Sequence, residues 1–324
     1  MEVIAYNSYC KVKIILSIDN YIRSVIMNSN IINNNIKRIR NVLIIILFAN
    51  VFVALLKIII GSVSKSTSLT ADGFHSLSDG ASNIVGLVGI WFASKPVDED
   101  HPYGHKKFET LASLFIGGML TIVGVKVVTQ AFQKFSNPIT PIINMESIIA
   151  LFLTLLVNIF VSKIEYSEGK KLTSQILISD SMHTRSDIYV SIGVIITLIG
   201  IKVGLPPVID PIASLVVGGF IFHAAYEIFA DTSGVLVDKA VIDAEKIKNI
   251  ALEFEEVKDA HNVRSRGTED EIYIDLHIMV DAYMSVEDSH TLSTNIEKRV
   301  KEELGENSQI ILHLEPYYEG RKRL

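Results

Sequence analysis

The chain is nearly free of cysteine, and this excludes several classes of site. Among its 324 residues there is one cysteine, Cys10. A single thiol cannot form an intramolecular disulfide, and it cannot build a Cys₄ zinc site or an iron–sulfur cluster. The sequence also lacks the glycine and lysine spacing of a phosphate-binding loop, a G-x-S-x-G elbow and the protein-kinase motifs. It therefore predicts neither an organic cofactor nor an enzyme.

Charged residues are also scarce. They make up 20% of the chain, and the mean hydropathy is +0.36, whereas soluble domains carry roughly 25% charged residues. These values argue against an all-soluble enzyme. The net charge of -6 argues against nucleic acid as a partner.

The apolar residues are concentrated before about residue 235. A transmembrane helix needs roughly 20 mostly apolar residues, and six segments qualify: 41–63, 67–94, 108–133, 145–164, 173–201 and 208–230. The second and fifth segments carry Asp, His and Ser, which are costly in a span and usually face a protein interior or a cavity. We predict an α-helical membrane protein with six transmembrane helices.

The orientation follows from Lys and Arg in the short loops, which are enriched on the cytoplasmic side. One set of loops carries Lys37, Arg38, Arg40, Lys95, Lys106, Lys107, Lys163, Lys170 and Lys171. The other set carries only Lys65, Lys134 and Lys202. We therefore expect a multi-pass protein of the cell membrane with both termini in the cytoplasm.

From about residue 239 the pattern changes to that of a soluble domain. Residues 241–256 and 286–304 have helical spacing, and residues 270–280 alternate strictly between apolar and polar side chains. A further strand is expected at 308–316. The order helix, strand, strand, helix, strand predicts a cytoplasmic α+β domain of ferredoxin-like type.

These patterns divide the chain into three regions. Residues 1–36 form an Asn-rich extension that we expect to be disordered, and its run KVKIILSI is too short to span a membrane. Residues 37–235 form the transmembrane domain, and residues 236–324 the cytoplasmic domain.

The spans contain two identical H-x-x-x-D pairs. His75 and Asp79 lie in the second span, and His183 and Asp187 in the fifth. Residues at i and i+4 share one helix face, so each pair can present two ligands to one ion. Two imidazoles and two carboxylates suit a four-coordinate cation, with Zn²⁺ first. A single pair could equally cap or bridge helices, but two pairs in apolar spans favour a metal site.

Two further clusters lie outside the spans. Asp98, His101 and His105 form D-x-x-H-x-x-x-H in one loop; a solvated polar loop is the simple alternative to a metal site there. The cytoplasmic domain carries His261, His277, His290, His313 and Glu315. His313 and Glu315 are two residues apart on a strand and share a face. Four histidines over every element of a small domain suggest bound metal.

The runs SLTADGFHSLSDGASN, DEDHPYGHKKFET, HTRSD, DAHNVRSR, IDLHIMV and ILHLEP resemble the cation diffusion facilitator family, and most closely its bacterial zinc/iron exporters. The resemblance covers about residues 40–318. It implies a homodimeric metal/proton antiporter with six spans, and assigns the three clusters as transport, loop and cytoplasmic metal sites. It also implies a charge interlock between Lys107 and Asp238.

Two positions depart from the family pattern. His75 stands where the bacterial members often have Asp, which bears on metal choice, and Glu315 stands where Asp is usual. We expect efflux of Zn²⁺, with Fe²⁺ or Co²⁺ as further candidates, driven by proton influx. A passive metal channel and a membrane-tethered metal sensor are the alternatives. The channel fits poorly with a tetrahedral site that strips the ion's water, and the sensor leaves the intramembrane ligands unexplained.

Overall fold

The computed structural model describes residues 34–59, 62, 76–77, 80–136, 145–206, 208–269 and 271–318. Contacts divide these residues into two compact units, which separate between Leu236 and Val237. The units are called here the helical unit and the tail unit.

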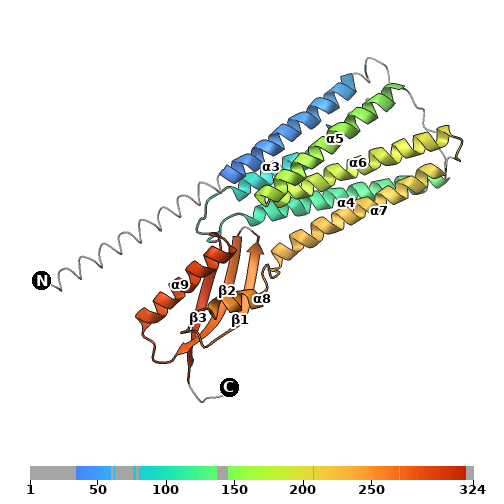
Figure 1. Ribbon diagram of the computed structural model, residues 1–324. Helices are drawn as coiled ribbons and strands as arrows, with labels where there is room; N and C mark the ends of the chain where they lie inside the picture. Colours follow the sequence, from blue (N-terminus) through green and yellow to red (C-terminus); the bar gives the residue numbers. More distant parts are fainter. Residues whose placement is uncertain are drawn as a thin grey trace. The chain divides into compact units, whose positions relative to one another are not determined.

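The helical unit is a bundle of long helices (Figure 1). It begins with a helix at Asn34–Ile59. The labelled helices that follow are α3 (Ala81–Ala93), α4 (Lys107–Ser136), α5 (Met145–Leu172), α6 (Gln175–Lys202) and α7 (Ile209–Leu236). Among the residues that the structure describes, three helices are long and apolar enough to cross a membrane by length and composition: Asn34–Ile59, Lys107–Phe135 and Ile209–Leu236.

The bundle is built from helix pairs, of which α4 with α7 and α5 with α6 make the most extensive contacts. Leu120 on α4 packs with Ile221 and Ile228 on α7. Gly89 lets α3 approach α4, because a Cβ atom there would lie 2.3 Å from the Cβ of Ala112. Many large apolar side chains point outward, including Phe48, Phe115 and Phe160. An apolar exterior around a polar interior is the arrangement expected in lipid.

The helices extend beyond the apolar segments predicted from the sequence. The first helix begins at Asn34, so the end of the predicted disordered extension is helical. The predicted apolar segment ends at 164, but the helix α5 continues to Leu172. Its last two turns contain charged residues, which the hydropathy pattern does not assign to a span. Of the predicted second span, 67–94, residues 67–75 and 78–79 lie outside the described residues, and residues 81–93 form α3.

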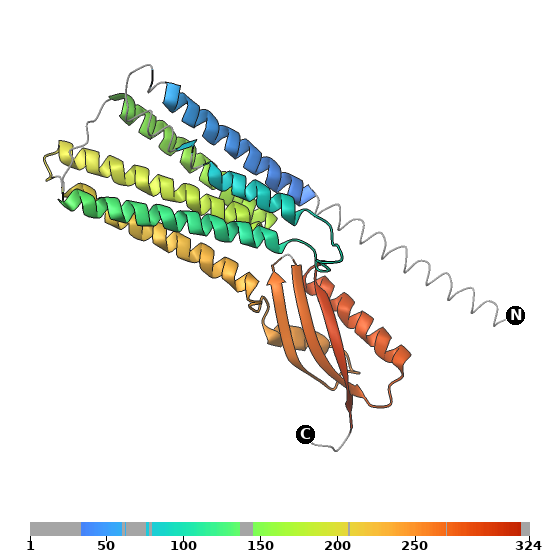
Figure 2. The same cartoon turned by 180° about the vertical axis from the view of Figure 1, so that it is seen from behind.

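In the described part of the tail unit there is a three-stranded sheet with two helices (Figures 1 and 2). In chain order its elements are α8 (Ala244–Ala251), β1 (Asp259–Thr268), β2 (Glu271–Asp281), α9 (Val286–Leu304) and β3 (Gln309–Tyr317). The strand order is β1-β2-β3. β1 is antiparallel to the central strand β2, and β3 is parallel to it. The predicted order of elements is confirmed, and with it the fold class.

The strict alternation in β2 separates an apolar face from a polar face. Ile274, Leu276 and Ile278 are buried, and they pack with side chains of α8 and α9. Both helices therefore cover the apolar face. The intervening residues of β2, which include His277, lie on the other face.

The helix α8 is shorter than the predicted 241–256. Asp243 caps it by accepting a hydrogen bond from the backbone N–H of Glu245 at 3.1 Å. After Leu252 the chain turns, and this brings Phe254 and Val257 against the core of the tail unit.

We predict that Ile278→Ala destabilises the tail unit by about 2–5 kcal/mol, because it leaves a cavity in the core. Ile311→Ala on β3 is the matched control, since Ile278 is 0% and Ile311 65% exposed. Hydrogen–deuterium exchange of residues 272–280 in the full-length protein should be faster in Ile278→Ala only. Equal exchange in both variants would contradict this packing.

Candidate functional site

Three histidines lie in one row across the polar face of the tail sheet. His261 on β1 pairs with His277 on β2, and His277 pairs with His313 on β3. The rings of His277 and His313 are 4.6 Å apart between centroids, and those of His261 and His277 are 5.6 Å apart. The sheet register thus brings together residues that are far apart in the sequence.

Glu315 connects two of these histidines through its two carboxylate oxygens. Its Oε1 lies 2.8 Å from Nδ1 of His277, and its Oε2 lies 3.3 Å from Nε2 of His261. Ligand atoms of His261, His277 and Glu315 all lie within 4.8 Å of one another. The hydrogen bond with His277, together with the charges of the histidines, lowers the pKa of Glu315. The trio is therefore a compact group of side chains that could hold a metal ion.

A β-bulge supplies a further neighbour to this cluster. The β1–β2 register shifts between His261 and Arg264, and Asn262 has a φ of 52°, a conformation that Asn tolerates better than most residues. Ala260 and Val263 both face the core, so His261 and Asn262 both remain on the polar face. The Nδ2 of Asn262 lies 3.2 Å from Nε2 of His277. The sequence analysis missed Asn262, because a bulge leaves no clear periodicity.

His290 is not brought to the cluster within one chain. It is exposed on α9, which packs on the apolar face of the sheet, whereas the other histidines lie on the polar face. The predicted set of five tail ligands is therefore incomplete in a single chain.

The loop residues Asp98, His101 and His105 form a second compact cluster. Nδ1 of His101 lies 2.9 Å from Oδ1 of Asp98, and Nε2 of His105 lies 3.3 Å from Oδ2. The hydrogen bond with His101 lowers the pKa of Asp98. His105 is buried, and its Nδ1 has no hydrogen-bond partner among the described residues. The structure thus brings the three predicted residues together, and ligand atoms of all three lie within 4.8 Å of one another.

Of the four predicted intramembrane ligands, the structure describes two. His183 is 4% exposed on α6, and its Nδ1 has no hydrogen-bond partner among the described residues. Asp187 follows it by four residues on the same helix. His75 and Asp79 lie outside the described residues, so the four-ligand site stays a prediction.

Around His183 lies a buried polar network that the sequence analysis missed. Asp180, one turn before His183, accepts a hydrogen bond from Asn83 on α3, and Asn83 accepts one from Asn50 at 3.0 Å. Glu165 on α5 accepts a hydrogen bond from Thr184 at 2.9 Å. Asp180 and Glu165 are 1% and 0% exposed. Charged residues within apolar spans could have indicated that such a network exists. Which of these residues contact one another depends on how the helices pack.

The remaining predicted pair, Lys107 and Asp238, has one member in each unit. Asp238 lies 3.8 Å from Arg266 within the tail unit, whereas Lys107 begins α4 in the helical unit. The two units are described separately, so the interlock stays a prediction.

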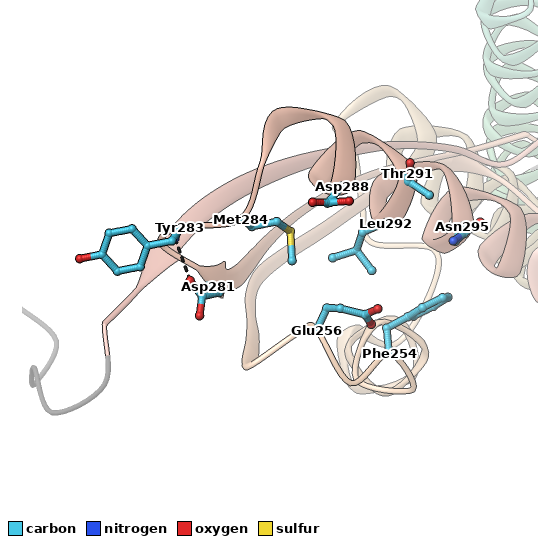
Figure 3. A pocket seen from close by; sticks show the side chains of 9 residues that line it. All are labelled: Phe254, Glu256, Asp281, Tyr283, Met284, Asp288, Thr291, Leu292 and Asn295. Carbon is cyan, nitrogen blue, oxygen red and sulfur yellow. Dashed lines mark hydrogen bonds between the residues drawn. The ribbon is translucent and has the colours of Figure 1, made fainter. Parts of the chain in front are cut away.

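The tail unit also contains an acidic hollow of about 440 Å³. Figure 3 shows Glu256, Asp281 and Asp288 around it, with the apolar side chains of Phe254 and Leu292. None of the histidines lines it, so it is distinct from the histidine cluster on the sheet.

Comparison with known proteins decides the family. Residues 43–237 match the cation efflux transmembrane domain, and residues 241–317 match the cation efflux protein cytoplasmic domain. The chain belongs to the cation diffusion facilitator family. This facilitator is thus a membrane transporter for efflux of divalent metal cations and not an enzyme.

Full-length relatives of this facilitator support the assignment. An uncharacterized transporter of Methanocaldococcus jannaschii is 32% identical over 82% of this chain and 94% of its own. The manganese efflux system protein MneP of Bacillus subtilis is 28% identical over 86% of this chain and 97% of its own. A solved structure of CzrB in a zinc form has 23% identity and covers 25% of this chain and 90% of its own. The TM-score of this match is 0.22, which is too low to support an inference.

We predict that Asp98→Asn weakens Zn²⁺ binding to the loop cluster at least about tenfold, because the carboxylate that contacts both histidines loses its charge. Asp100→Asn in the same loop is the control. Calorimetric titration in a His183→Ala/His277→Ala background removes ligands of the other two predicted sites. Equal affinity of the two Asn variants would argue against a metal site in this loop.

Proposed function

We propose that this facilitator exports Zn²⁺ in exchange for protons, and that His75, Asp79, His183 and Asp187 bind the ion during transport. The observation that carries the proposal is the position of His183. Its imidazole is buried inside the helical unit, has an unpartnered Nδ1 among the described residues, and lies one helical turn from Asp187. An orphaned buried nitrogen is costly unless something binds it.

The proposed ligand set favours zinc on chemical grounds. Two imidazole nitrogens and two carboxylate oxygens match the tetrahedral N/O coordination of Zn²⁺. The two carboxylates also balance the charge of a divalent ion when both imidazoles are neutral. Mn²⁺ and Mg²⁺ prefer more oxygen ligands and higher coordination numbers.

Proton coupling follows from the same residues. Metal ligands must be deprotonated, so metal binding releases protons and proton binding releases metal. Histidine titrates near neutral pH, which suits His75 and His183 as proton carriers. Alternating access of the site to the two sides of the membrane would then couple proton influx to metal efflux.

The loop and tail clusters have the same arrangement of side chains, and this arrangement supports a metal-sensing role. In each, one carboxylate contacts two histidines through separate oxygens: Asp98 with His101 and His105, and Glu315 with His261 and His277. A metal ion that binds either cluster would replace these contacts. We infer a homodimer in which His290 completes the tail cluster from a second copy of the chain, and in which Lys107 and Asp238 form the interlock.

The proposed topology places both termini in the cytoplasm. The tail unit matches a cytoplasmic domain, and α7 leads directly into it. The excess of Lys and Arg in the loops on that side agrees with this direction. With six spans the N-terminus lies on the same side.

Manganese is the rival substrate, because a relative of this chain is named a manganese efflux protein. Zn²⁺ and Mn²⁺ favour different ligand atoms at position 75. An oxygen-rich site suits Mn²⁺, whereas an imidazole at this position favours Zn²⁺.

We predict that Asp187→Asn abolishes zinc transport driven by a pH gradient in proteoliposomes, because the ligand set loses a charge and a donor oxygen. Asp231→Asn, at an exposed position of α7, should transport normally. Both variants should keep the elution volume and helicity of the wild type. Normal transport by Asp187→Asn would refute the assignment of the site.

We predict the transport order Zn²⁺ first, Co²⁺ or Fe²⁺ next, and Cd²⁺ and Mn²⁺ poor. His75→Asp should relax this order and admit Cd²⁺, because it adds charge and a more adaptable donor. The measurement is competition by each ion for zinc uptake into vesicles. If the wild type moves Mn²⁺ as well as Zn²⁺, or if His75→Asp leaves the order unchanged, His75 does not set selectivity.

A further inference from the structure

A basic hollow lies on the outer surface of the helical unit, between α5 and α6. Its volume is about 610 Å³, and Lys163, Tyr166, Lys170 and Arg185 are among the residues that line it. The ring of Tyr166 is near two cations: its centroid is 4.5 Å from Cζ of Arg185 and 5.9 Å from Nζ of Lys170. An aromatic ring holds such cations in place by cation–π attraction.

The positive charge of this hollow is largely uncompensated. Lys171 also lines it, but its Nζ is paired with Glu168 at 3.0 Å, and Glu168 is paired with Arg38 as well. Lys163, Lys170 and Arg185 form no ion pair within the part of the chain that the structure describes. Three cations around one concave surface favour an anionic ligand with several oxygens.

An apolar surface continues from the hollow along both helices. On α5 one face carries, at alternating spacings of four and three, Phe152, Leu156, Ile159, Lys163, Tyr166 and Lys170. On α6 one face carries Arg185, Ile188, Ile192 and Ile196. In both helices the cations lie nearer the α5–α6 turn, and the exposed apolar residues lie farther from it.

The turn between α5 and α6 belongs to the cytoplasmic side in the proposed topology. Successive helices α5, α6 and α7 run in opposite directions (Figures 1 and 2), and α7 leads into the tail unit, which matches a cytoplasmic domain. The cytoplasmic leaflet is the one that carries anionic lipids and attracts Lys and Arg.

We propose that this hollow binds the headgroup phosphate of an anionic phospholipid from the cytoplasmic leaflet, with an acyl chain along the apolar faces of α5 and α6. The proposal rests on the topology given under the proposed function. A soluble anion would use the cations alone, whereas a phospholipid uses the cations and the adjoining apolar surface together. Basic pockets between transmembrane helices are suited to such headgroups.

The test is lipid binding by the full-length protein in detergent, measured by native mass spectrometry. Phosphatidylglycerol and phosphatidylcholine with the same dioleoyl chains are the probes. We expect the wild type to retain phosphatidylglycerol preferentially. Lys163→Gln/Lys170→Gln should weaken this binding about 25-fold, since each cation near the headgroup contributes about a fivefold factor.

The matched control is Arg40→Gln/Lys95→Gln, which removes two exposed cations from the same predicted side, outside the hollow. It should bind phosphatidylglycerol like the wild type. Lys163→Arg/Lys170→Arg keeps the charge and should also retain binding, which separates loss of charge from misfolding.

Three outcomes would overturn the proposal. They are equal retention of the two lipids by the wild type, equal loss in both Gln double variants, and full displacement by soluble glycerol 1-phosphate, which would indicate a free phosphate site. Lipid binding is measured without metal transport, so failure of the proposed zinc export would not be confused with failure of this site.

Discussion

The helical unit depends on one constraint, which is that polar groups buried among apolar helices must satisfy one another. Asn50 bonds to Asn83, and Asn83 bonds to Asp180, so the first helix, α3 and α6 are joined by a single chain of hydrogen bonds. The bond between Thr184 and Glu165 joins α6 to α5. Because each group is expensive without its partner, the network fixes how these helices pack around His183.

The same principle operates at the start of α6. The carboxylate of Glu109 on α4 is buried and accepts a hydrogen bond from Ser174 at 2.5 Å, and it lies 3.4 Å from the backbone nitrogen of Ile176. It therefore satisfies backbone and hydroxyl groups where α6 begins. His183 and Asp187 follow on this helix, so their position depends on a contact with another helix far away in the sequence.

In the tail unit the constraint is the two-residue period of the strands. Apolar residues of β2 face the helices, so His277 must lie on the opposite face. The register then sets His261 and His313 beside it, and Glu315, two residues beyond His313, reaches both His261 and His277. A one-residue slip would bury His277 and disperse the cluster.

Much of this could be predicted from the sequence. The alternation of residues 270–280 and the period of 286–304 predicted β2 and α9 to within one residue, because short-range periodicity reflects which face is buried. The spacing of Asp98, His101 and His105 predicted a cluster that one loop can close by itself. The helical length of α5, the early end of α8 and the bulge at Asn262 were not predictable, since each arises from packing against distant residues.

The sequence by itself determined which chemical groups the protein has, the order of its elements and the local spacing of each ligand pair. It determined these because hydropathy, charge and periodicity are properties of neighbouring residues. Only the tertiary structure decided which distant groups meet. The strand register joined Glu315 to His261 and His277, and helix packing gathered Glu165, Asp180 and Asn83 near His183. It also placed His290 on the wrong side of the sheet to join its predicted partners within one chain. Contacts between distant residues depend on the free energy of burial and hydrogen bonding across the whole fold. A local sequence pattern does not contain this information.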